Sequence, residues 1–266
     1  MTNPVQLVMV ESVTRVTPRM ARVTFTGEGL SSLETWPDQQ LKLLFPPEDR
    51  PLVLPQPSTT DDAMRWYTAY LAIPAEDRPI MRSFTVRTLT PDHLVIDFVL
   101  HPHGGPAAQW AMTARAGDTL ARYGPAEEYK RDLPLDADWV LLAGDETALP
   151  AVGSLLPLKN ATVLVEVADA SEEQDLPNVT WLHRNNTQHG QRLMEAVQAL
   201  TIPEGSRFAW LAGEAAMVRT LRRTLVSKGI PKSTIDFTGY WRARLTQDDA
   251  PTEADMADIQ ERLTNI

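Results

Sequence analysis

Three near-continuous apolar runs in the second half of the chain constrain its fold more than any other feature. They are WVLLAGD from Trp139, TVLVEVAD from Thr162 and RFAWLAGE from Arg207. Such runs are typical of parallel strands that are buried on both faces of a sheet. Patterns of helical spacing, QRLMEAVQAL and EAAMVRTLRRTLVSKGIP, alternate with the runs, and the second ends on a Gly and Pro stop signal. This alternation predicts an α/β domain with a parallel sheet, residues 135–266.

The first half has a different pattern, in which short β-branched runs are separated by turn residues. The runs are VQLVMVESVTRVT, ARVTFTG, LKLLF, SFTVRTL and HLVIDFVLH, and GDTLARYGP closes the half. Several short strands joined by hairpin turns favour an antiparallel barrel. We therefore expect residues 1–134 to form a β-barrel domain in a two-domain α+β protein. The stretch DDAMRWYTAYLAIP, inside a long polar loop, is compatible with either a strand or a helix.

The composition excludes several classes of function. The chain has no cysteine, which rules out disulfides, thiol catalysis and a thiolate-held iron–sulfur cluster, so electron transfer would need an organic cofactor. The net charge of −10 at pH 7 argues against general nucleic-acid binding. No apolar run approaches the roughly 20 residues of a membrane span, and the first residues lack the pattern of a signal peptide. We expect a cytoplasmic protein without stable membrane association.

The stretch MRSFTVR, from Met81, combines cations, hydroxyls and an aromatic ring on one predicted strand. On a strand, Arg82 and Phe84 point to one face, and Ser83 and Thr85 point to the other. A flavin requires an aromatic ring against its isoalloxazine, hydrogen bonds near its reactive nitrogen and cations at its pyrophosphate, and this strand offers all three. An ordinary amphipathic strand is the alternative.

A glycine-rich turn, HPHGGPAAQWA from His101, follows the next predicted strand. Gly104 and Gly105 permit a close backbone approach, and Pro106 suits the first turn of a helix. A turn that enters a helix in this way presents unpaired N–H groups to an anion, although a simple helix start is the alternative. His101 and His103 lack a third candidate ligand nearby, so we predict no metal site.

Each of the three apolar strands ends on an acidic residue: Asp145, Asp169 and Glu214. In such sheets, ligands bind outside the carboxyl ends of the strands. The sequence GDETALPA, residues 144–151, turns there from strand to helix, where a dinucleotide could sit, although it is not the G-x-G-x-x-G fingerprint. GYWR, residues 239–242, ends the last strand and either covers a ligand or is structural.

These pieces occur in the order LKLLFP, RSFTVR, HPHGGPAAQWA, GDTL, GP, GDETALPA, EVAD, WLAGE and GYWR. In that order the chain, along nearly its whole length, resembles the siderophore-interacting proteins, which are NAD(P)H-dependent ferric-siderophore reductases related to ferredoxin reductases. The resemblance implies an N-terminal FAD-binding barrel and a C-terminal domain that binds NADPH or NADH. It also implies a ferric siderophore or other ferric chelate as the substrate, from which iron leaves as Fe(II).

The resemblance further implies which residues form the sites. Those expected to bind the cofactors are Arg82, Ser83, Phe84, Thr85, His101, His103, Gly104, Gly105, Pro106, Ala107, Trp110, Asp145, Thr147, Ala148 and Trp241. Those expected to line the substrate pocket are Lys42 and Arg242, with Arg244 nearby. No side chain is expected to act as an acid or a base, because the flavin supplies the chemistry and the protein positions it.

Two positions depart from the pattern of this family. A His-Gly pair is usual at the phosphate turn, and the His101-Pro102 pair found here removes one N–H donor. A GPRG-like element is usual after the last strand of the barrel, whereas this chain has GPAEEY, in which Tyr129 could replace the missing contact to adenine.

Three questions stay open at the level of the sequence. A non-catalytic module that binds siderophore or flavin, and a diaphorase-like flavoenzyme with another acceptor, would share some of these motifs. Arg184 and Arg207 are candidate partners for the 2′-phosphate of NADPH, so the choice between NADPH and NADH is open. We expect a monomer in which the acidic helix of the tail, residues 247–266, packs on the body.

Overall fold

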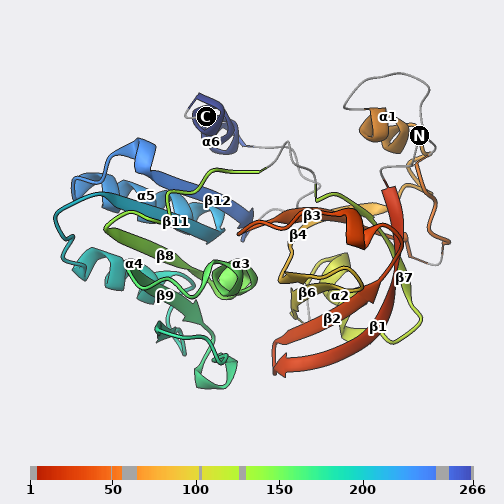
Figure 1. The fold of residues 1–266 in the computed structure, drawn as a ribbon, viewed down its shortest axis with the longest axis horizontal. Coiled ribbons are helices and arrows are strands. Elements are labelled where there is room, and N and C mark those ends of the chain that lie inside the picture. Colours follow the sequence, from red (N-terminus) through yellow and green to blue (C-terminus); the bar gives the residue numbers. More distant parts are fainter. Residues whose placement is uncertain are drawn as a thin grey trace. The chain divides into compact units, whose positions relative to one another are not determined.

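The computed structural model describes residues 5–48, 50–55, 65–101, 104–125, 130–243 and 252–264. The chain forms two compact units, one built on antiparallel and the other on parallel strands (Figure 1). Unit 1 comprises Met1–Asp132, Pro150–Pro157 and Gln174–Leu176. Unit 2 comprises Leu133–Leu149, Leu158–Glu173 and Pro177–Ile266.

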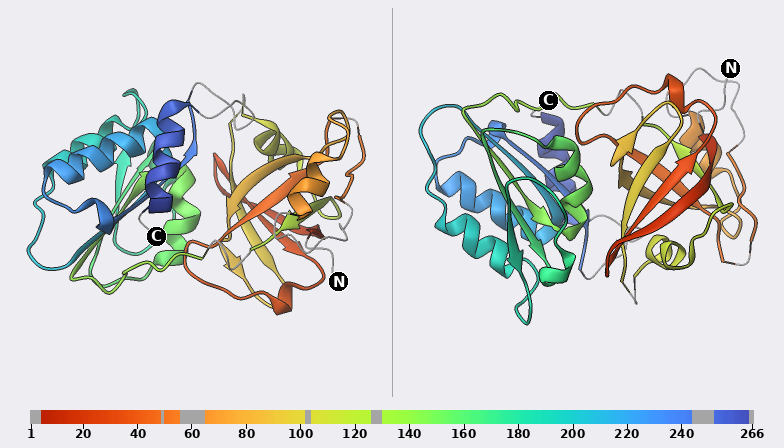
Figure 2. Two further views of the ribbon diagram at one scale, coloured as in Figure 1. Left: turned by 90° about the horizontal axis from the view of Figure 1, so that it is seen from above. Right: turned by 60° about the horizontal axis from the view of Figure 1, so that its bottom comes forward.

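Unit 1 contains one antiparallel sheet of seven strands in the order β4-β3-β7-β1-β2-β6-β5. The strands are β1 (Val5–Thr17), β2 (Met20–Thr26), β3 (Gln40–Phe45), β4 (Ile80–Thr85), β5 (Thr88–Leu89), β6 (Leu94–Val99) and β7 (Thr119–Tyr123). β4 and β5 follow each other closely in the chain, yet β4 pairs with β3 at one edge of the sheet and β5 pairs with β6 at the other. The two edges are thereby joined, and the sheet curls into a barrel (Figure 2). The predicted antiparallel barrel is confirmed.

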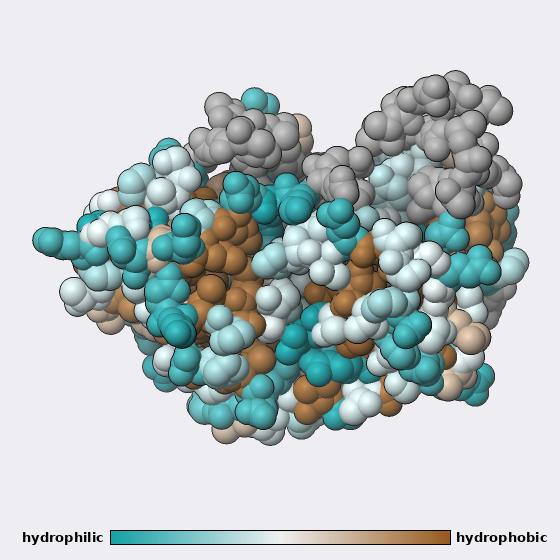
Figure 3. Space-filling model, viewed as in Figure 1, coloured by the Kyte–Doolittle hydropathy of each residue, from teal (hydrophilic) through white to brown (hydrophobic). Residues whose placement is uncertain are grey.

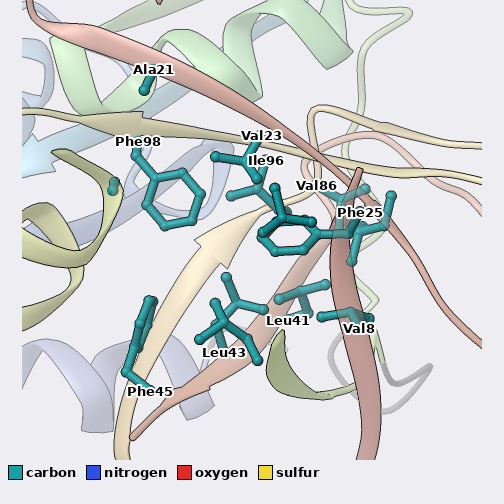
Figure 4. Packing of buried hydrophobic residues seen from close by; sticks show 14 of the residues in the cluster. Val8, Ala21, Val23, Phe25, Leu41, Leu43, Phe45, Val86, Ile96 and Phe98 are labelled. Atoms are coloured by element: carbon teal, nitrogen blue, oxygen red, sulfur yellow. The ribbon is translucent and has the colours of Figure 1, made fainter. Parts of the chain in front are cut away.

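Apolar side chains that alternate along the strands fill the inside of this barrel. Phe25, Leu43 and Phe98 are each at most 1% exposed and lie in one cluster (Figure 4). Trp110 of helix α2 (Pro106–Thr113) packs against the rings of Phe25 and Phe98, with centroid distances of 6.2 and 5.5 Å. The helix that follows the glycine-rich turn is therefore fixed to the barrel core.

The stretch that the sequence left undecided is a helix, α1 (Arg65–Leu71). Its Trp66 stacks on Tyr123 of β7 with ring centroids 3.8 Å apart. With Val5 and Leu44, these rings form a second, smaller apolar cluster of unit 1. A helix of seven residues is too short for its period to stand out in the sequence.

Unit 2 contains a parallel sheet of five strands in the order β10-β9-β8-β11-β12. The strands are β8 (Trp139–Asp145), β9 (Ala161–Val167), β10 (Val179–His183), β11 (Arg207–Glu214) and β12 (Ile235–Trp241). Helices α4 (Gln191–Ala199) and α5 (Ala215–Ser227) lie side by side on one face of the sheet (Figure 2). The predicted parallel α/β arrangement is confirmed. β10 was not predicted, because its sequence VTWLH is mostly half-buried and is not a continuous apolar run.

Two further helices complete the described chain. α3 (Leu149–Leu155) follows β8, and its residues from Pro150 onward group with unit 1. α6 (Glu253–Thr264) lies in the C-terminal part of the chain, where the sequence predicted a helix. Among the described helices, none is long and apolar enough to cross a bilayer. On the face drawn in Figure 3, apolar residues reach the surface in patches between hydrophilic ones, as is usual for a folded protein.

The inward-facing residues of unit 1 should dominate its stability. Leu43→Ala removes a side chain that is fully buried in the barrel core, so we expect the free energy of unfolding to fall by about 2–5 kcal/mol. Leu7→Ala, on strand β1, is the matched control, because Leu7 is 48% exposed and should cost less than about 1 kcal/mol. Urea denaturation of both variants measures the difference, and equal losses would contradict this assignment of the core.

Candidate functional site

Strand β4 presents Arg82 and Phe84 to the inside of the barrel. Arg82 pairs directly with Leu43, and Phe84 pairs with Leu41, and both leucines belong to the barrel core. Residues directly opposite on neighbouring strands share a face. The half-buried Phe84 ring lies 4.6 Å from the Phe98 ring, measured between centroids. The predicted orientation of these two side chains is confirmed.

The other face of β4 carries Ser83 and Thr85, as predicted. The Nζ of Lys42, on β3, donates to the Oγ of Ser83 at 2.5 Å. Burial lowers the pKa of Lys42. Thr85 is 7% exposed, so only a small part of it can meet a ligand. Lys42 is therefore a half-buried cation next to the hydroxyl group of Ser83.

Arg87, just beyond β4, lies near a buried carboxylate of unit 1 and has a role in packing. Its Nε lies 3.9 Å from Asp97, a buried carboxylate to which Arg22 donates two hydrogen bonds of 2.7 and 2.8 Å. A Cβ added to Gly153 of α3 would lie 2.5 Å from the Arg87 guanidinium carbon. The glycine thus makes room for the guanidinium, and Arg87 is used in packing unit 1.

Arg122, on β7, is a residue that the sequence analysis missed. It is 3% exposed and pairs with Leu43, so it shares the inner face of the sheet with Arg82. Its Nη1 donates to the carbonyl of Gly124 at 2.6 Å, while its Nε has no partner among the described residues. Burial lowers the pKa of Arg122 to about 10. A buried cation with an unsatisfied donor suits a nearby anion.

The glycine-rich turn has the local structure that the sequence predicted. The N–H of Gly104 donates to the carbonyl of His101 at 2.8 Å, and a Cβ on Gly104 would lie 2.6 Å from the Cβ of Ala108. Gly105 is the N-cap of α2, and Pro106 is its first residue. A Cβ on Gly105 would meet nothing within 4 Å, so space is open at the helix N-terminus. Pro102 and His103 lie outside the described residues, as does Tyr129.

These features of unit 1 fit a flavin dinucleotide. The open helix N-terminus offers N–H groups from Ala107 onward to a phosphate. Arg82 adds a guanidinium, and the buried Nε of Arg122 is an unsatisfied donor on the same face. Phe84 is only half-buried, which leaves part of its ring available for stacking.

In unit 2, Asp145 is a fully buried hub at the carboxyl end of β8. Its Oδ1 accepts from the N–H of Thr147 at 2.9 Å and also from the Thr147 hydroxyl. Its Oδ2 accepts from the N–H of Glu214 at 2.9 Å and from the indole Nε1 of Trp241 at 3.0 Å. The Nε2 of His189 lies 3.3 Å from the same oxygen. The carboxylate therefore connects three strands and the turn before α4.

The geometry around this hub requires a glycine. Gly213, on β11, has a φ of +140°, and a Cβ there would lie 2.6 Å from the Oδ2 of Asp145. Any side chain would strain the backbone and displace the carboxylate. The glycine of the WLAGE motif is thus explained by the close approach of Asp145.

Asp145 and His189 stabilise each other as an ion pair. Burial alone would raise the pKa of Asp145, but the nearby imidazole of His189 and the bonds from Thr147 and Trp241 outweigh burial and hold that pKa below its usual range. Burial alone would lower the pKa of His189, but Asp145, with a smaller effect of Glu146, raises it. His189 was not predicted, because nothing near it in the sequence marks it and only the fold brings it to Asp145.

Arg184 does not have the environment predicted for a 2′-phosphate partner. Its guanidinium donates to Glu146 at 2.8 Å and reaches Glu166 at 3.4 Å, and its side chain is 14% exposed. Arg207 begins β11 and so lies at the amino end of the sheet, away from the expected ligand edge. Both candidates are therefore withdrawn.

Asp145, Glu146 and His189 lie close enough together to hold a metal ion. Each of them already has a partner of opposite charge, because Asp145 faces His189, and Glu146 accepts from Arg184. A metal would have to displace these ion pairs and the N–H donors of Asp145. We assign the group to the ion-pair network of the sheet edge.

Trp241 is the last residue of β12 and Arg242 follows it, and each has a partner. Trp241 is half-buried and bonds to Asp145, while the Nη1 of Arg242 donates to Asp255 of α6 at 3.1 Å. Asp255 also accepts from Arg219 at 3.2 Å. Burial acts in the other direction, but bonds from Thr252, Arg219 and Arg242 lower the pKa of Asp255 to about 2. Arg244 lies outside the described residues.

The predicted site residues thus fall into two groups. In unit 1, Phe84 and Trp110 both pack on the barrel core, and Arg82 shares the face of Phe84 on β4. In unit 2, Asp145 bonds to both Thr147 and Trp241. Among the predicted site residues of unit 2, Thr147 and Trp241 are partly exposed, whereas Asp145 and Ala148 are fully buried. Lys42 belongs to unit 1 and Arg242 to unit 2. Asp145 and Ala148 are thus suited to position their neighbours.

Two family models match the chain. Residues 9–129 match the siderophore-interacting FAD-binding domain, and residues 137–244 match the siderophore-interacting protein model. Ferric vibriobactin reductase ViuB of Vibrio cholerae is 31% identical over 242 residues, which cover 85% of this chain and 85% of that protein. The NADPH-dependent ferric-chelate reductase of Escherichia coli is 29% identical over 246 residues, 87% of this chain and 91% of that protein.

A solved structure extends the likeness to the fold. A siderophore utilization protein from T. fusca has a TM-score of 0.77 and 35% sequence identity to this chain. The match covers 94% of this chain and 97% of that one. The likeness therefore spans both units.

The Asp145–His189 pair should make stability depend on pH. Because the folded-state pKa of His189 is raised, its contribution is fully present below the unfolded value of 6.5 and is lost as pH rises through the folded pKa. Asp145 stays ionised in this range, because its pKa is lowered. We expect His189→Gln to reduce the free energy of unfolding most near about pH 5.5 and least near about pH 8.5, measured by urea denaturation.

His93→Gln provides the control for this measurement. It removes an exposed pairing with Glu11 in the other unit, which should be worth less than about 1 kcal/mol at any pH. An effect of His189→Gln that grew with rising pH would contradict the assigned ion pair.

Proposed function

This chain belongs to the siderophore-interacting protein family, and from that premise we propose that it is an NAD(P)H-dependent reductase of ferric siderophores and other ferric chelates. The observation that carries the proposal is that one chain contains two different regions suited to bind a ligand. One is the barrel strand with its glycine-rich turn, and the other is the carboxyl edge of a parallel sheet. A reductase of this type needs both, whereas a module that only binds flavin needs the first alone.

FAD is the cofactor that the first region is suited to hold. We propose that Arg82 and the N–H groups at the start of α2 bind its phosphates, that Phe84 stacks on its ring system and that Thr85 bonds to the ring edge. His101, next to the turn, is exposed and can reach a phosphate. Bound FAD would supply the conversion between a two-electron hydride donor, the reduced nicotinamide, and the one-electron acceptor Fe(III).

The second region is suited to a nicotinamide nucleotide. Ligands of parallel sheets bind outside the carboxyl ends of the strands, where Thr147 and Trp241 are held by Asp145. Because the carboxylate fixes both side chains, they are positioned before the nucleotide arrives. Their proposed task is to orient the nicotinamide and to exclude water from it.

Although the protein is acidic overall, two cationic side chains are available to bind an anionic ferric chelate. Lys42 is half-buried, and each close pair of opposite charges contributes about 4 kcal/mol at an effective dielectric constant near 20. We propose that Lys42 and Arg242 bind the ferric chelate. Fe(II) binds hard oxygen ligands less strongly than Fe(III), so reduction releases the metal. We further propose that the protein acts in the cytoplasm as a monomer.

The decisive experiment follows the colour of the flavin without oxygen. The protein is loaded with FAD, reduced with NADPH or NADH and then mixed with a ferric catecholate chelate and an Fe(II)-trapping dye. We expect the nucleotide to bleach the flavin, the chelate to restore its colour, and Fe(II) to form in step with the recovery. The same chelate carrying redox-inert Ga(III) should leave the flavin bleached.

Each failure has a distinct meaning. Protein that binds no FAD would contradict the proposal as a whole. FAD that binds but is bleached by neither nucleotide would indicate a non-catalytic module. Bleaching without Fe(II) formation would indicate a diaphorase-like enzyme with another acceptor.

A further inference from the structure

We propose that Asp255 of α6 determines the specificity of the chelate site, because it shares the guanidinium of Arg242 with the substrate and so limits how much negative charge the site accepts. This inference rests on the proposed function, in which Arg242 binds the ferric chelate, and it adds the property by which chelates are selected. All the residues involved belong to unit 2.

Two arginines from distant segments of the chain converge on this one carboxylate. The Nη1 of Arg219, on α5, donates to the Oδ1 of Asp255 at 3.2 Å, and the Nη1 of Arg242 donates to its Oδ2 at 3.1 Å. The side chains of Arg219, Arg242 and Asp255 are 20, 18 and 17% exposed. Water therefore screens these ion pairs less than it screens fully exposed ones.

The start of α6 fixes the position of this carboxylate. Thr252, just before the helix, donates from its N–H and its hydroxyl to the Oδ2 of Asp255 at 2.9 and 2.7 Å. The N–H of Asp255 donates in return to the hydroxyl oxygen of Thr252 at 3.2 Å. Such reciprocal bonding between residues three apart is a capping box. The helix itself therefore holds the carboxylate in place, independently of the two arginines.

Asp255 lowers the positive charge that the two arginines present to a substrate. A pair of guanidiniums with one carboxylate has half the net charge of the pair alone. Both arginines have further interactions, so the inference concerns only the part of their charge that Asp255 offsets. An anionic chelate that bonds to Arg242 must displace the carboxylate or lie close to it, and like charges repel. The cost of binding therefore grows with the negative charge of the chelate.

Ferric chelates differ widely in their charge. Three catecholate dianions around Fe(III) give a trianionic complex, whereas three hydroxamate monoanions give a neutral one. Because the Coulomb energy scales with the product of the charges, the carboxylate should weaken the binding of the trianionic complex and hardly affect that of the neutral one. Asp255 thus shifts the selectivity of the site toward chelates of low charge.

The test measures binding without reduction. The FAD-loaded protein is titrated calorimetrically, near neutral pH and at constant ionic strength, with the Ga(III) complexes of a tris-catecholate and a tris-hydroxamate. Ga(III) has the charge of Fe(III) and is redox-inert, and Asp255 is ionised under these conditions because its pKa is about 2. We expect Asp255→Asn to bind the tris-catecholate about tenfold more tightly than the wild type does, and the tris-hydroxamate within about twofold.

Two further variants separate this effect from a general one. The amide oxygen of Asp255→Asn can still accept from Thr252, so the helix start is retained. Glu253→Gln is the matched control, because it removes the same charge from an exposed position of the same helix, and its affinities should equal those of the wild type within about twofold. In an Arg242→Ala background, Asp255→Asn should change the affinity for the tris-catecholate by less than about threefold, because its effect acts through Arg242.

An unchanged or weakened affinity of Asp255→Asn for the tris-catecholate would overturn the inference. So would equal gains for both chelates, an equal gain in Glu253→Gln, an undiminished gain in the Arg242→Ala background, or a wild type that binds neither chelate. If the wild type binds the Ga(III) chelates but reduces no ferric chelate, the proposed function fails, and the affinities still decide the inference by themselves.

Discussion

The rest of the structure depends on one constraint, which is that the two faces of strand β4 carry different side chains. Because side chains alternate along a strand, Arg82 and Phe84 share a face with the barrel core, while Thr85 lies on the face of Lys42. A shift of one residue would exchange the two sets. In the observed register, Leu43 of β3 lies opposite Arg82 and is fully buried in the barrel core. The packing of the core therefore decides which chemical groups this strand offers to a ligand.

In unit 2, a buried charge determines which side chains are presented to a ligand. An unpaired carboxylate would be costly in a site that excludes water, yet Asp145 is fully buried and supplied with N–H donors and an imidazole. These partners come from different strands, so satisfying the charge also fixes the ends of β8, β11 and β12 against one another. The side chains that can reach a nucleotide, Thr147 and Trp241, are positioned as a result.

The sequence predicted what local patterns determine. Continuous apolar runs marked β8, β9 and β11, and the alternation in β4 gave the faces of Arg82 and Phe84 correctly. The sequence did not reveal His189 or Arg122, because the residues that surround each of them come from segments distant in the chain. Arg184 was misread for the same reason, because its position next to a strand end was visible whereas its ion pairs with Glu146 and Glu166 were not. Contacts over long sequence distances carry no local signature, so part of each site could be seen only in the fold.

We propose above all that Arg82 of β4 binds FAD. The most direct measurement is the dissociation constant of FAD from the apoprotein and from two variants. Arg82→Ala should weaken binding by roughly tenfold to a hundredfold, since a hydrogen bond to a charged group is worth about 1.5–3 kcal/mol. Arg22→Ala, which removes a guanidinium that pairs with Asp97 instead, should leave the affinity within about twofold. Equal losses in both variants, or unchanged binding in Arg82→Ala, would contradict the account.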